Sequence, residues 1–272
     1  MNIRRLLFAA SVFAAAPALA QEEEAPIQDN SFLIEEAYNQ EPGVVQHINT
    51  FSRARGGAWA YSFTQEWPFF SQRHQVSFTL PVERVGGGTT FETGIGDLLL
   101  NYRYQLVGSG DTRLAVAPRL SLVVPTGDEE RGLGGGGAGV QANLPVSYVL
   151  SGRLVAHSNA GLTWIPGAKD AAGAEAATTS FNLGQSVVWL AHPLVNLLVE
   201  AAWSQDEEVA GDDATATSRS FFVSPGVRGA INVRGGLQIV PGIAVPIGVG
   251  PSDGERAVFL YFSLEHPFRK QR

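Results

Sequence analysis

The chain contains no cysteine, which excludes disulfide bonds, thiolate chemistry and metal sites with cysteine ligands. Beyond the N-terminus it also lacks any run of the roughly 18–20 apolar residues that a membrane-spanning helix requires. Basic residues are in deficit, because 19 Lys and Arg stand against 26 Asp and Glu, giving a formal charge of −7. Nucleic-acid binding selects for basic patches, so this balance argues against it.

The N-terminus has the three parts of a secretory signal peptide. Arg4 and Arg5 precede an apolar run from Leu6 to Ala16, and a segment of small residues ends at Ala20. This pattern predicts cleavage after Ala20 and an exported protein of a bacterial envelope. The alternative, a short membrane anchor, would need about 18 or more apolar residues.

Most of the remaining chain consists of short segments in which apolar residues alternate with polar or small ones. Residues 75–82, 98–106 and 197–204 are clear examples. A period of two places alternate side chains on opposite faces of a β-strand. In lipid only a closed sheet leaves no unpaired backbone edge, so the pattern predicts an all-β fold, a transmembrane antiparallel β-barrel that is apolar outside and polar inside.

The expected organisation is a signal peptide over residues 1–20, a periplasmic segment over 21–42, an outer-membrane barrel over 43–268 and a basic tail over 269–272. A tilted strand needs ~9–11 residues to cross a bilayer. About twelve segments meet this length, and we predict strands at residues 43–54, 57–69, 73–84, 95–107, 112–124, 138–150, 153–165, 179–190, 195–205, 218–228, 235–247 and 256–268.

The connections between these strands alternate in length. Short ones are predicted at 70–72, 108–111, 151–152, 191–194 and 229–234, and long ones at 85–94, 125–137, 166–178, 206–217 and 248–255. Outer-membrane barrels have short periplasmic turns and longer extracellular loops. An even number of strands then places both termini in the periplasm.

Before the first strand, residues 31–42 are predicted as a short helix near or inside the periplasmic mouth. Ser31 precedes Glu35 and Glu36 as a helix-capping residue would, and Pro42 would end the helix. An irregular leader is the alternative, because the apolar stripe is narrow.

Aromatic residues gather near predicted strand ends, which is typical of the girdles at the two membrane interfaces. A sandwich core is the alternative explanation for them. The proposed girdle residues are Trp59, Trp67, Tyr102, Tyr104, Tyr148, Trp164, Trp189, Trp203 and Phe221. The last strand alternates up to Phe268 and resembles the C-terminal signal that the barrel assembly machinery recognises, although a basic tail follows it.

Polar residues on the interior faces are the candidate lumen-lining groups. Charges of both signs there either line a wet passage or form a paired network that fills a narrow lumen. A twelve-stranded barrel is intermediate in size between filled eight-stranded barrels and open porins, so its size alone does not decide between these two interpretations. The candidates are Glu66, Glu83, Asp97, Asn101, Arg103, Arg119, Gln141, Asn143, Arg153, His157, Asn159, Glu200, Arg228, Gln238 and Glu265.

Three motifs contain residue types that could support catalysis or ligand binding. His157 lies beside Ser158 in a stretch that superficially resembles outer-membrane phospholipases, but adjacent residues point to opposite faces of a strand, so a lumenal hydrogen-bonding role is favoured. Acidic clusters at 128–130, 206–208 and 212–213 could bind a hard cation, although solvated loops explain them as well. The glycines of 132–139 lack a Walker lysine and form no phosphate loop.

Three stretches resemble one family of outer-membrane proteins, the MetA-pathway of phenol degradation family. They are residues 32–46 (FLIEEAYNQEPGVVQ), 94–104 (GIGDLLLNYRY) and 118–128 (PRLSLVVPTGD). The resemblance implies a transporter of the outer membrane, and the family name implies small apolar or aromatic solutes.

We therefore predict an outer-membrane channel for passive uptake of such solutes, which is not an enzyme and uses no cofactor or metal. Its expected partners are outer-membrane lipid, the barrel assembly machinery and a small-molecule solute. The alternatives are a structural or adhesive barrel with a filled lumen and, third, a lipase-like enzyme.

Overall fold

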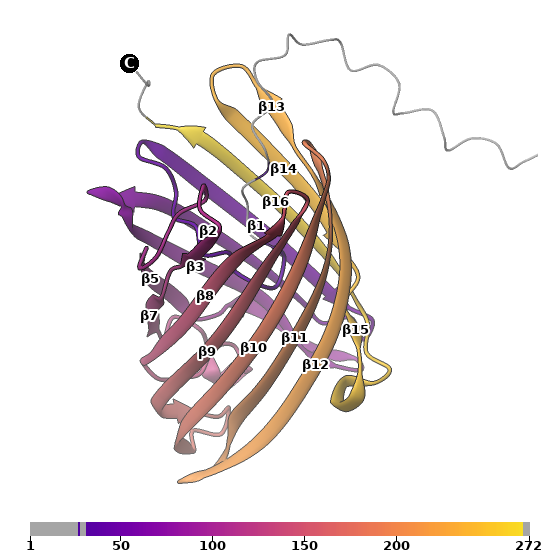
Figure 1. Cartoon of the computed structure of the whole chain (residues 1–272). Coiled ribbons are helices and arrows are strands. Elements are labelled where there is room, and N and C mark those ends of the chain that lie inside the picture. Colours follow the sequence, from indigo (N-terminus) through magenta and orange to yellow (C-terminus); the bar gives the residue numbers. More distant parts are fainter. Residues whose placement is uncertain (1–26, 28–30, 269–272) are drawn as a thin grey trace, which may run out of the picture.

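The structure is a computed structural model that describes residue 27 and residues 31–268. In the described part of the chain, sixteen strands form one antiparallel sheet that closes into a twelve-stranded barrel (Figure 1). The all-β barrel predicted from the alternation is confirmed. The predicted signal peptide and basic tail lie outside the described residues, as do residues 21–26 and 28–30 of the predicted periplasmic segment 21–42.

The strands cover most of the chain from residue 44 onward. Their bounds are β1 (Val44–Ala54), β2 (Trp59–Phe69), β3 (Ser71–Gly87), β4 (Thr90–Ile95), β5 (Leu98–Tyr104), β6 (Leu114–Val116), β7 (Arg119–Val124), β8 (Gly139–Ser151), β9 (Leu154–Lys169), β10 (Glu175–His192), β11 (Val195–Gly211), β12 (Ala214–Gly229), β13 (Ile231–Val233), β14 (Leu237–Ala244), β15 (Ile247–Gly248) and β16 (Ala257–Pro267).

Short strands combine to give the twelve members of the barrel wall. β4 and β5 both pair with β3, β6 and β7 both pair with β8, and β14 and β15 both pair with β12. The first and last strands close the ring, because β1 pairs with β16 along its whole length, from Val44 opposite Pro267 to Ala54 opposite Ala257. Closure leaves no exposed sheet edge in the membrane.

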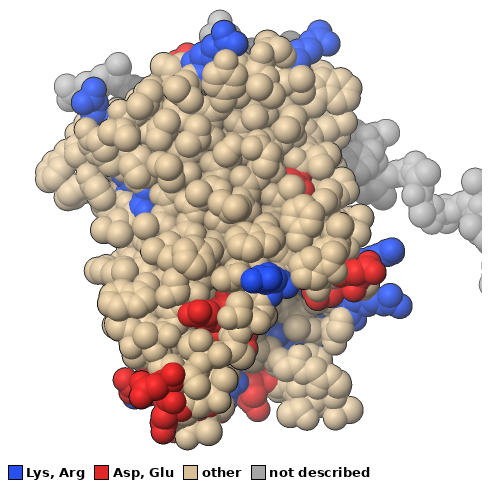
Figure 2. Space-filling model, turned by 60° about the horizontal axis from the view of Figure 1, so that its bottom comes forward, with Lys and Arg blue, Asp and Glu red and all other residues tan. Residues whose placement is uncertain are grey.

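Burial alternates along each strand as the barrel requires. In β7, Leu120 and Leu122 are each 55% exposed whereas Ser121 between them is 1% exposed. In β11, Val199 is 52% exposed and the adjacent Glu200 is fully buried. The outer wall is therefore apolar and the inner wall polar, and charged side chains gather near the ends of the wall in Figure 2.

The barrel has two different ends. The turn end holds the short connections, the start of β1 and the end of β16, and the loop end holds the other connections. Three connections predicted as long loops are instead continuations of paired strands: 85–94 lies in the β3–β4 hairpin, 166–178 in the β9–β10 hairpin and 206–217 in the β11–β12 hairpin.

These strands continue because backbone hydrogen bonds between the two strands stabilise a hairpin even where both of its faces are exposed to solvent. The β11–β12 hairpin reverses at Asp212 and Asp213, and Asp213 has a φ of 55°. Aspartate tolerates this left-handed conformation. Irregular loops with a short 3-10 helix remain at η1 (Glu129–Arg131) and η2 (Gly250–Ser252).

The predicted helix over residues 31–42 is wrong. The segment contains bends but no helical turn, and it lies inside the barrel. Its backbone groups bind side chains of the barrel wall instead of one another, as described below, so the irregular alternative holds. No helix in the described part of the chain is long and apolar enough to cross a bilayer.

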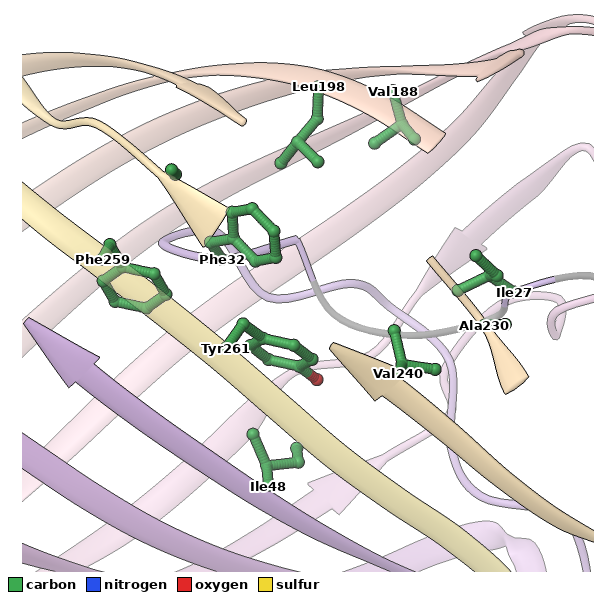
Figure 3. Close-up of a cluster of buried hydrophobic side chains, with 10 residues drawn as sticks. Ile27, Phe32, Ile48, Val188, Leu198, Ala230, Val240, Phe259 and Tyr261 are labelled. Carbon is green, nitrogen blue, oxygen red and sulfur yellow. The ribbon is translucent and has the colours of Figure 1, made fainter. Parts of the chain in front are cut away.

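The main apolar cluster lies inside the lumen, where Figure 3 shows Phe32 among Leu198, Phe259 and Tyr261 of the wall. The Phe32 ring lies 5.7 Å from the ring centre of Phe259 and 5.3 Å from that of Tyr261. Val188 and Leu198 belong to the same cluster. One side of the inner wall is therefore apolar, and it receives a residue from the segment that precedes β1.

Candidate functional site: the lumen and its N-terminal segment

Residues 31–42, which we call the lumen segment, pass through the interior of the barrel. Ser31, Ile34 and Ala37 are each no more than 3% exposed. The segment starts beside β10 and β11, passes β9, β8 and β5, and reaches β3 and β1. It ends at Gly43, whose φ of 88° lets the chain turn into β1.

Side chains of the wall accept hydrogen bonds from the backbone N–H groups of this segment. Glu200 Oε1 accepts from Leu33 N at 2.9 Å and from Ile34 N at 3.2 Å. Four further N–H groups donate to wall side chains at 2.7–3.1 Å: Glu35 to Asn159, Ala37 to Ser147, Asn39 to Gln105 and Gln40 to Gln75.

Other wall side chains donate to the carbonyl oxygens of the segment. Arg103 donates to the carbonyls of Glu36 and Tyr38 and, at 2.9 Å, to Asn39 Oδ1. Gln105 donates to Ala37 O and Asn159 to Glu35 O, each at 2.8 Å. Buried backbone groups must be paired, and here the polar inner wall pairs them. This pairing is the reason why no helix forms.

Glycines in three strands make room for the apolar side chains of the segment. A Cβ at Gly184 would lie 2.0 Å from Ile34 Cδ1, and one at Gly226 or Gly242 would lie 2.6 or 2.5 Å from the Phe32 ring. Real side chains do not approach so closely, so these positions require glycine while the segment is in place. A strand-interior glycine often marks such a close approach.

One ion pair joins the lumen segment to the polar wall, and a second joins two strands of the wall. Arg119 contacts Glu35 at 2.5 Å and donates to Asn101 Oδ1 at 3.1 Å. Arg103 lies 3.8 Å from Glu66. Burial alone would raise the pKa of Glu35, but the Arg119 guanidinium outweighs this effect and holds that pKa below its ordinary value of 4.5. Glu35 is therefore ionised at neutral pH, and its charge holds the segment to β7.

The segment separates cavities at the two ends of the barrel. At the loop end, a cavity of about 630 Å³ reaches Leu33 from Phe222, Pro246 and the connections around Gly56 and Gly254. A second cavity, of about 230 Å³, lies between residues 31–35 and a wall of hydroxyl and amide groups. That wall is formed by Thr50, Ser62, Thr64, Ser77, Thr79 and Asn101.

At the turn end, a cavity of about 670 Å³ lies between Tyr38 and the short connections. Its lining joins apolar and polar groups: Val149, Val155, Val188, His157, Asn196 and Arg228. Asn196 Nδ2 is buried and has no hydrogen-bond partner among the described residues. Asn196 thus lines the cavity, beside an apolar surface, with a buried amide group whose Nδ2 has no described partner.

The structure places most of the lumen candidates on the inner wall. Buried there are Glu66, Asn101, Arg103, Asn143, His157, Asn159, Glu200 and Arg228, and half-buried are Glu83, Arg119, Gln141, Gln238 and Glu265. Two candidates have other surroundings. Asp97 lies at the loop end and accepts from Gly127 N at 3.0 Å and Gly135 N at 2.7 Å, so it fixes the 125–137 loop. Arg153 is exposed in the turn between β8 and β9.

His157 bonds a serine, but not the one next to it in sequence. Its Nδ1 lies 2.8 Å from Ser147 Oγ on β8, and Ser147 also accepts from Ala37 N. Both residues are no more than 2% exposed. This serine is enclosed beneath the lumen segment, so the pair serves to hold the segment rather than to attack a substrate. Among the described residues, no three His, Asp or Glu side chains form a group that could hold a metal ion.

A comparison with protein families matches residues 32–245 to the model described as "Putative MetA-pathway of phenol degradation". The chain belongs to this family. The match begins within the lumen segment and covers the strands that hold it. No curated protein matches the chain.

The chain is similar in structure to solved outer-membrane proteins, and the first of them below shares its barrel fold. The COG4313 outer membrane channel from Pseudomonas putida F1 has a TM-score of 0.62 at 14% identity, over 84% of this chain and 97% of that chain. The KdgM porin has a TM-score of 0.48 at 7% identity, over 82% and 99%. The Ralstonia pickettii toluene transporter TbuX has a TM-score of 0.40 at 9% identity, over 85% and 90%.

In this family member, sequence reasoning missed the residues that hold the lumen segment besides the charged ones. Gln75, Ser147 and Ser186 bond the segment from inward-facing strand positions, and Gln105 bonds it from the position just after β5. Their alternation with apolar neighbours was visible in the sequence. The other signal was Gly184 and the similar strand-interior glycines, which mark places where another part of the chain approaches the wall.

Proposed function

We propose that the protein is a passive outer-membrane channel for small solutes that combine an apolar body, such as an aromatic ring, with one polar group. The lumen segment forms its constriction. Such a channel needs no cofactor and no energy input, since a solute moves down its own concentration gradient through sites of matching polarity.

The observation that carries this proposal is the contrast between the two sides of the lumen. Near β1, β2 and β3 the wall bears hydroxyl groups, including Thr64 and Thr79, whose Oγ1 atoms lie 2.8 Å apart. Around β10, β11, β14 and β16 it bears the apolar cluster of Val188, Leu198 and Phe259. A solute at the constriction meets both surfaces, which favours molecules with one apolar and one polar side.

The turn-end cavity supports the same class of solute. Its volume of about 670 Å³ falls within the ~300–1,000 Å³ range of small-molecule sites. The free Nδ2 donor of Asn196 would bind a hydroxyl or carboxylate oxygen, while Val188 and Leu190 contact the apolar part. The family description, which refers to phenol degradation, agrees with such a molecule.

The proposed location is the outer membrane, after export by the predicted signal peptide, with outer-membrane lipid around the wall. The alternating outward face of β16, including Leu260 and Phe262, supports recognition by the barrel assembly machinery. The proposed orientation places the turn end in the periplasm.

Proteoliposome swelling tests the proposal with a neighbouring pair of residues. Val188 faces the lumen at 1% exposure and Val187 faces outward at 40%. At mildly alkaline pH, we expect sodium 4-hydroxybenzoate to enter wild-type liposomes faster than arabinose. Val188→Asn should reduce entry of the aromatic solute several-fold, and Val187→Asn should not. Absence of both swelling and ion conductance in the wild type would contradict the channel and favour a filled structural barrel.

A further inference from the structure

Besides the lumen, the outer surface at the loop end carries an unusual row of side chains on β1, β2 and β3. Arg53 lies opposite Trp59, and Trp59 lies opposite Arg84. The three residues thus occupy one level of three neighbouring strands. In the alternation of each strand, these three residues lie on the same face of the sheet as Phe51 and Phe78. Ser52 and Glu83, which are next to them in sequence, lie on the opposite, inner face. The row therefore faces outward.

Two more arginines lie close to this row. Arg55 N donates to Arg256 O at 2.9 Å, which brings the β1–β2 turn beside the start of β16. Arg84 lies with its guanidinium 4.0 Å from the centre of the Phe91 ring. We call Arg53, Arg55, Arg84 and Arg256, together with Trp59, the arginine row.

Among the residues that the structure describes, the guanidinium groups of the row have no carboxylate within 4.0 Å. Ion pairs in the described part of the chain, within 4.0 Å, involve Arg103, Arg119 and Arg131, and none involves an arginine of the row. Glu255 precedes Arg256 and lines the loop-end cavity together with Arg55. Glu207 and Glu208 lie elsewhere, near the tip of the β11–β12 hairpin. Figure 2 shows basic and acidic side chains both present near this end.

The next level of the same strands, toward the middle of the wall, is apolar and aromatic. Phe51 lies opposite Tyr61, which lies opposite Val82. The ring centres of Phe51 and Trp59 are 5.9 Å apart. Aromatic rings favour the headgroup level of a bilayer, so the arginines are placed where lipid headgroups begin and acyl chains end.

We propose that the arginine row binds a phosphorylated glycolipid of the outer leaflet. Guanidinium groups bind phosphate bidentately and strongly. The outward Arg53 and Arg84 form no ion pair with any described residue, so they place positive charge on the outer face of a chain that is acidic as a whole. The apolar level below the row would contact the acyl chains. A lipid, rather than free phosphate, fits both levels.

The proposal places the loop end at the outer leaflet and is independent of what passes through the lumen. Native mass spectrometry of the full-length barrel, released from detergent with added lipid A, tests it. We expect Arg53→Gln combined with Arg84→Gln to weaken lipid A binding at least tenfold. The control, Lys169→Gln combined with Arg219→Gln, removes the same charge at other loop-end strands and should bind as the wild type does.

Three comparisons make the test decisive. Lipid A without its phosphates should bind the wild type at least tenfold more weakly, and inorganic phosphate alone should not compete at equal concentration. Equal binding by the Arg53/Arg84 variant, or by dephosphorylated lipid, would overturn the proposal, as would full competition by free phosphate. If the Gln variant does not fold, Arg53→Lys with Arg84→Lys keeps the charge but loses bidentate geometry. Binding by that variant at wild-type strength would likewise overturn it.

Discussion

Replacing Glu200 by leucine should release the lumen segment while the barrel stays folded. Glu200 is fully buried on β11, and one of its oxygens accepts both the Leu33 and Ile34 N–H groups. Leucine has a similar size but accepts no hydrogen bond. The substitution would therefore leave two N–H groups without a partner whenever the segment is in place.

The expected effect on the segment is large. A hydrogen bond to a charged group contributes about 1.5–3 kcal/mol, so two give about 3–6 kcal/mol. The lower value is appropriate, because Glu200 is fully buried and seating the segment costs desolvation of its carboxylate. About 3 kcal/mol corresponds to a roughly hundredfold increase in the displaced population, at about 1.4 kcal/mol for each factor of ten.

Single-channel recording in planar bilayers measures this population as the fraction of time spent at the larger conductance. Glu200→Leu should raise that fraction, and Glu200→Gln, which keeps one carbonyl acceptor, should have a smaller effect. Glu207→Gln near the loop end serves as the control for loss of one negative charge. Retained heat-modifiability must show that each barrel is folded. Recordings of Glu200→Leu that match those of the wild type would refute the proposed role of this carboxylate.

Three further predictions concern the lumen segment and the outer wall. Acidification below about pH 4.5, the ordinary pKa of a glutamate, should increase large openings. The folded pKa of Glu35 is lowered, so its ion pair with Arg119 is fully present above pH 4.5 and is lost as the pH falls through the folded pKa. Glu35→Gln should remove this pH dependence in the same recordings. Gly242→Val should displace the segment by clashing with Phe32, and adding Phe32→Ala should restore the wild-type conductance; failure of this rescue would count against the glycine contact. Leu122→Lys on the outer wall should destabilise the barrel by about 2–4 kcal/mol in urea unfolding into lipid, and an unchanged midpoint would show that this face does not contact the bilayer.

The barrel could be predicted from the sequence because a closed sheet in lipid imposes a simple rule on every strand. Leu120, Ser121 and Leu122 already show the apolar, polar, apolar order that burial later reproduces. The connections were less predictable. A polar stretch such as 206–217 fits a loop and a solvated hairpin equally well, and only the pairing of β11 with β12 decides between them.

The lumen segment could not be derived in the same way. Ser31 and Glu35 fit a capped helix locally, but distant side chains such as Asn159 and Arg119 compete for the same groups. That competition depends on which residues the closed barrel brings together, more than 80 positions apart in sequence. The alternation of polar and apolar residues identified the inward-facing polar side chains. Only the structure shows that they bind backbone groups of a segment inside the lumen.

The central claim is that residues 31–42 occupy the lumen, and disulfide trapping tests it most directly. The chain has no cysteine, so introduced pairs are free of background, and Ser31 Oγ lies 2.8 Å from Ser186 Oγ on β10. Ser31→Cys with Ser186→Cys should form a disulfide in intact membranes under mild oxidation and should suppress large openings until it is reduced. The control pair, Ser31→Cys with Ser109→Cys at an exposed turn, should stay reduced. A Ser31/Ser186 pair that stays reduced in the folded barrel, or crosslinks no faster than the control, would contradict the claim.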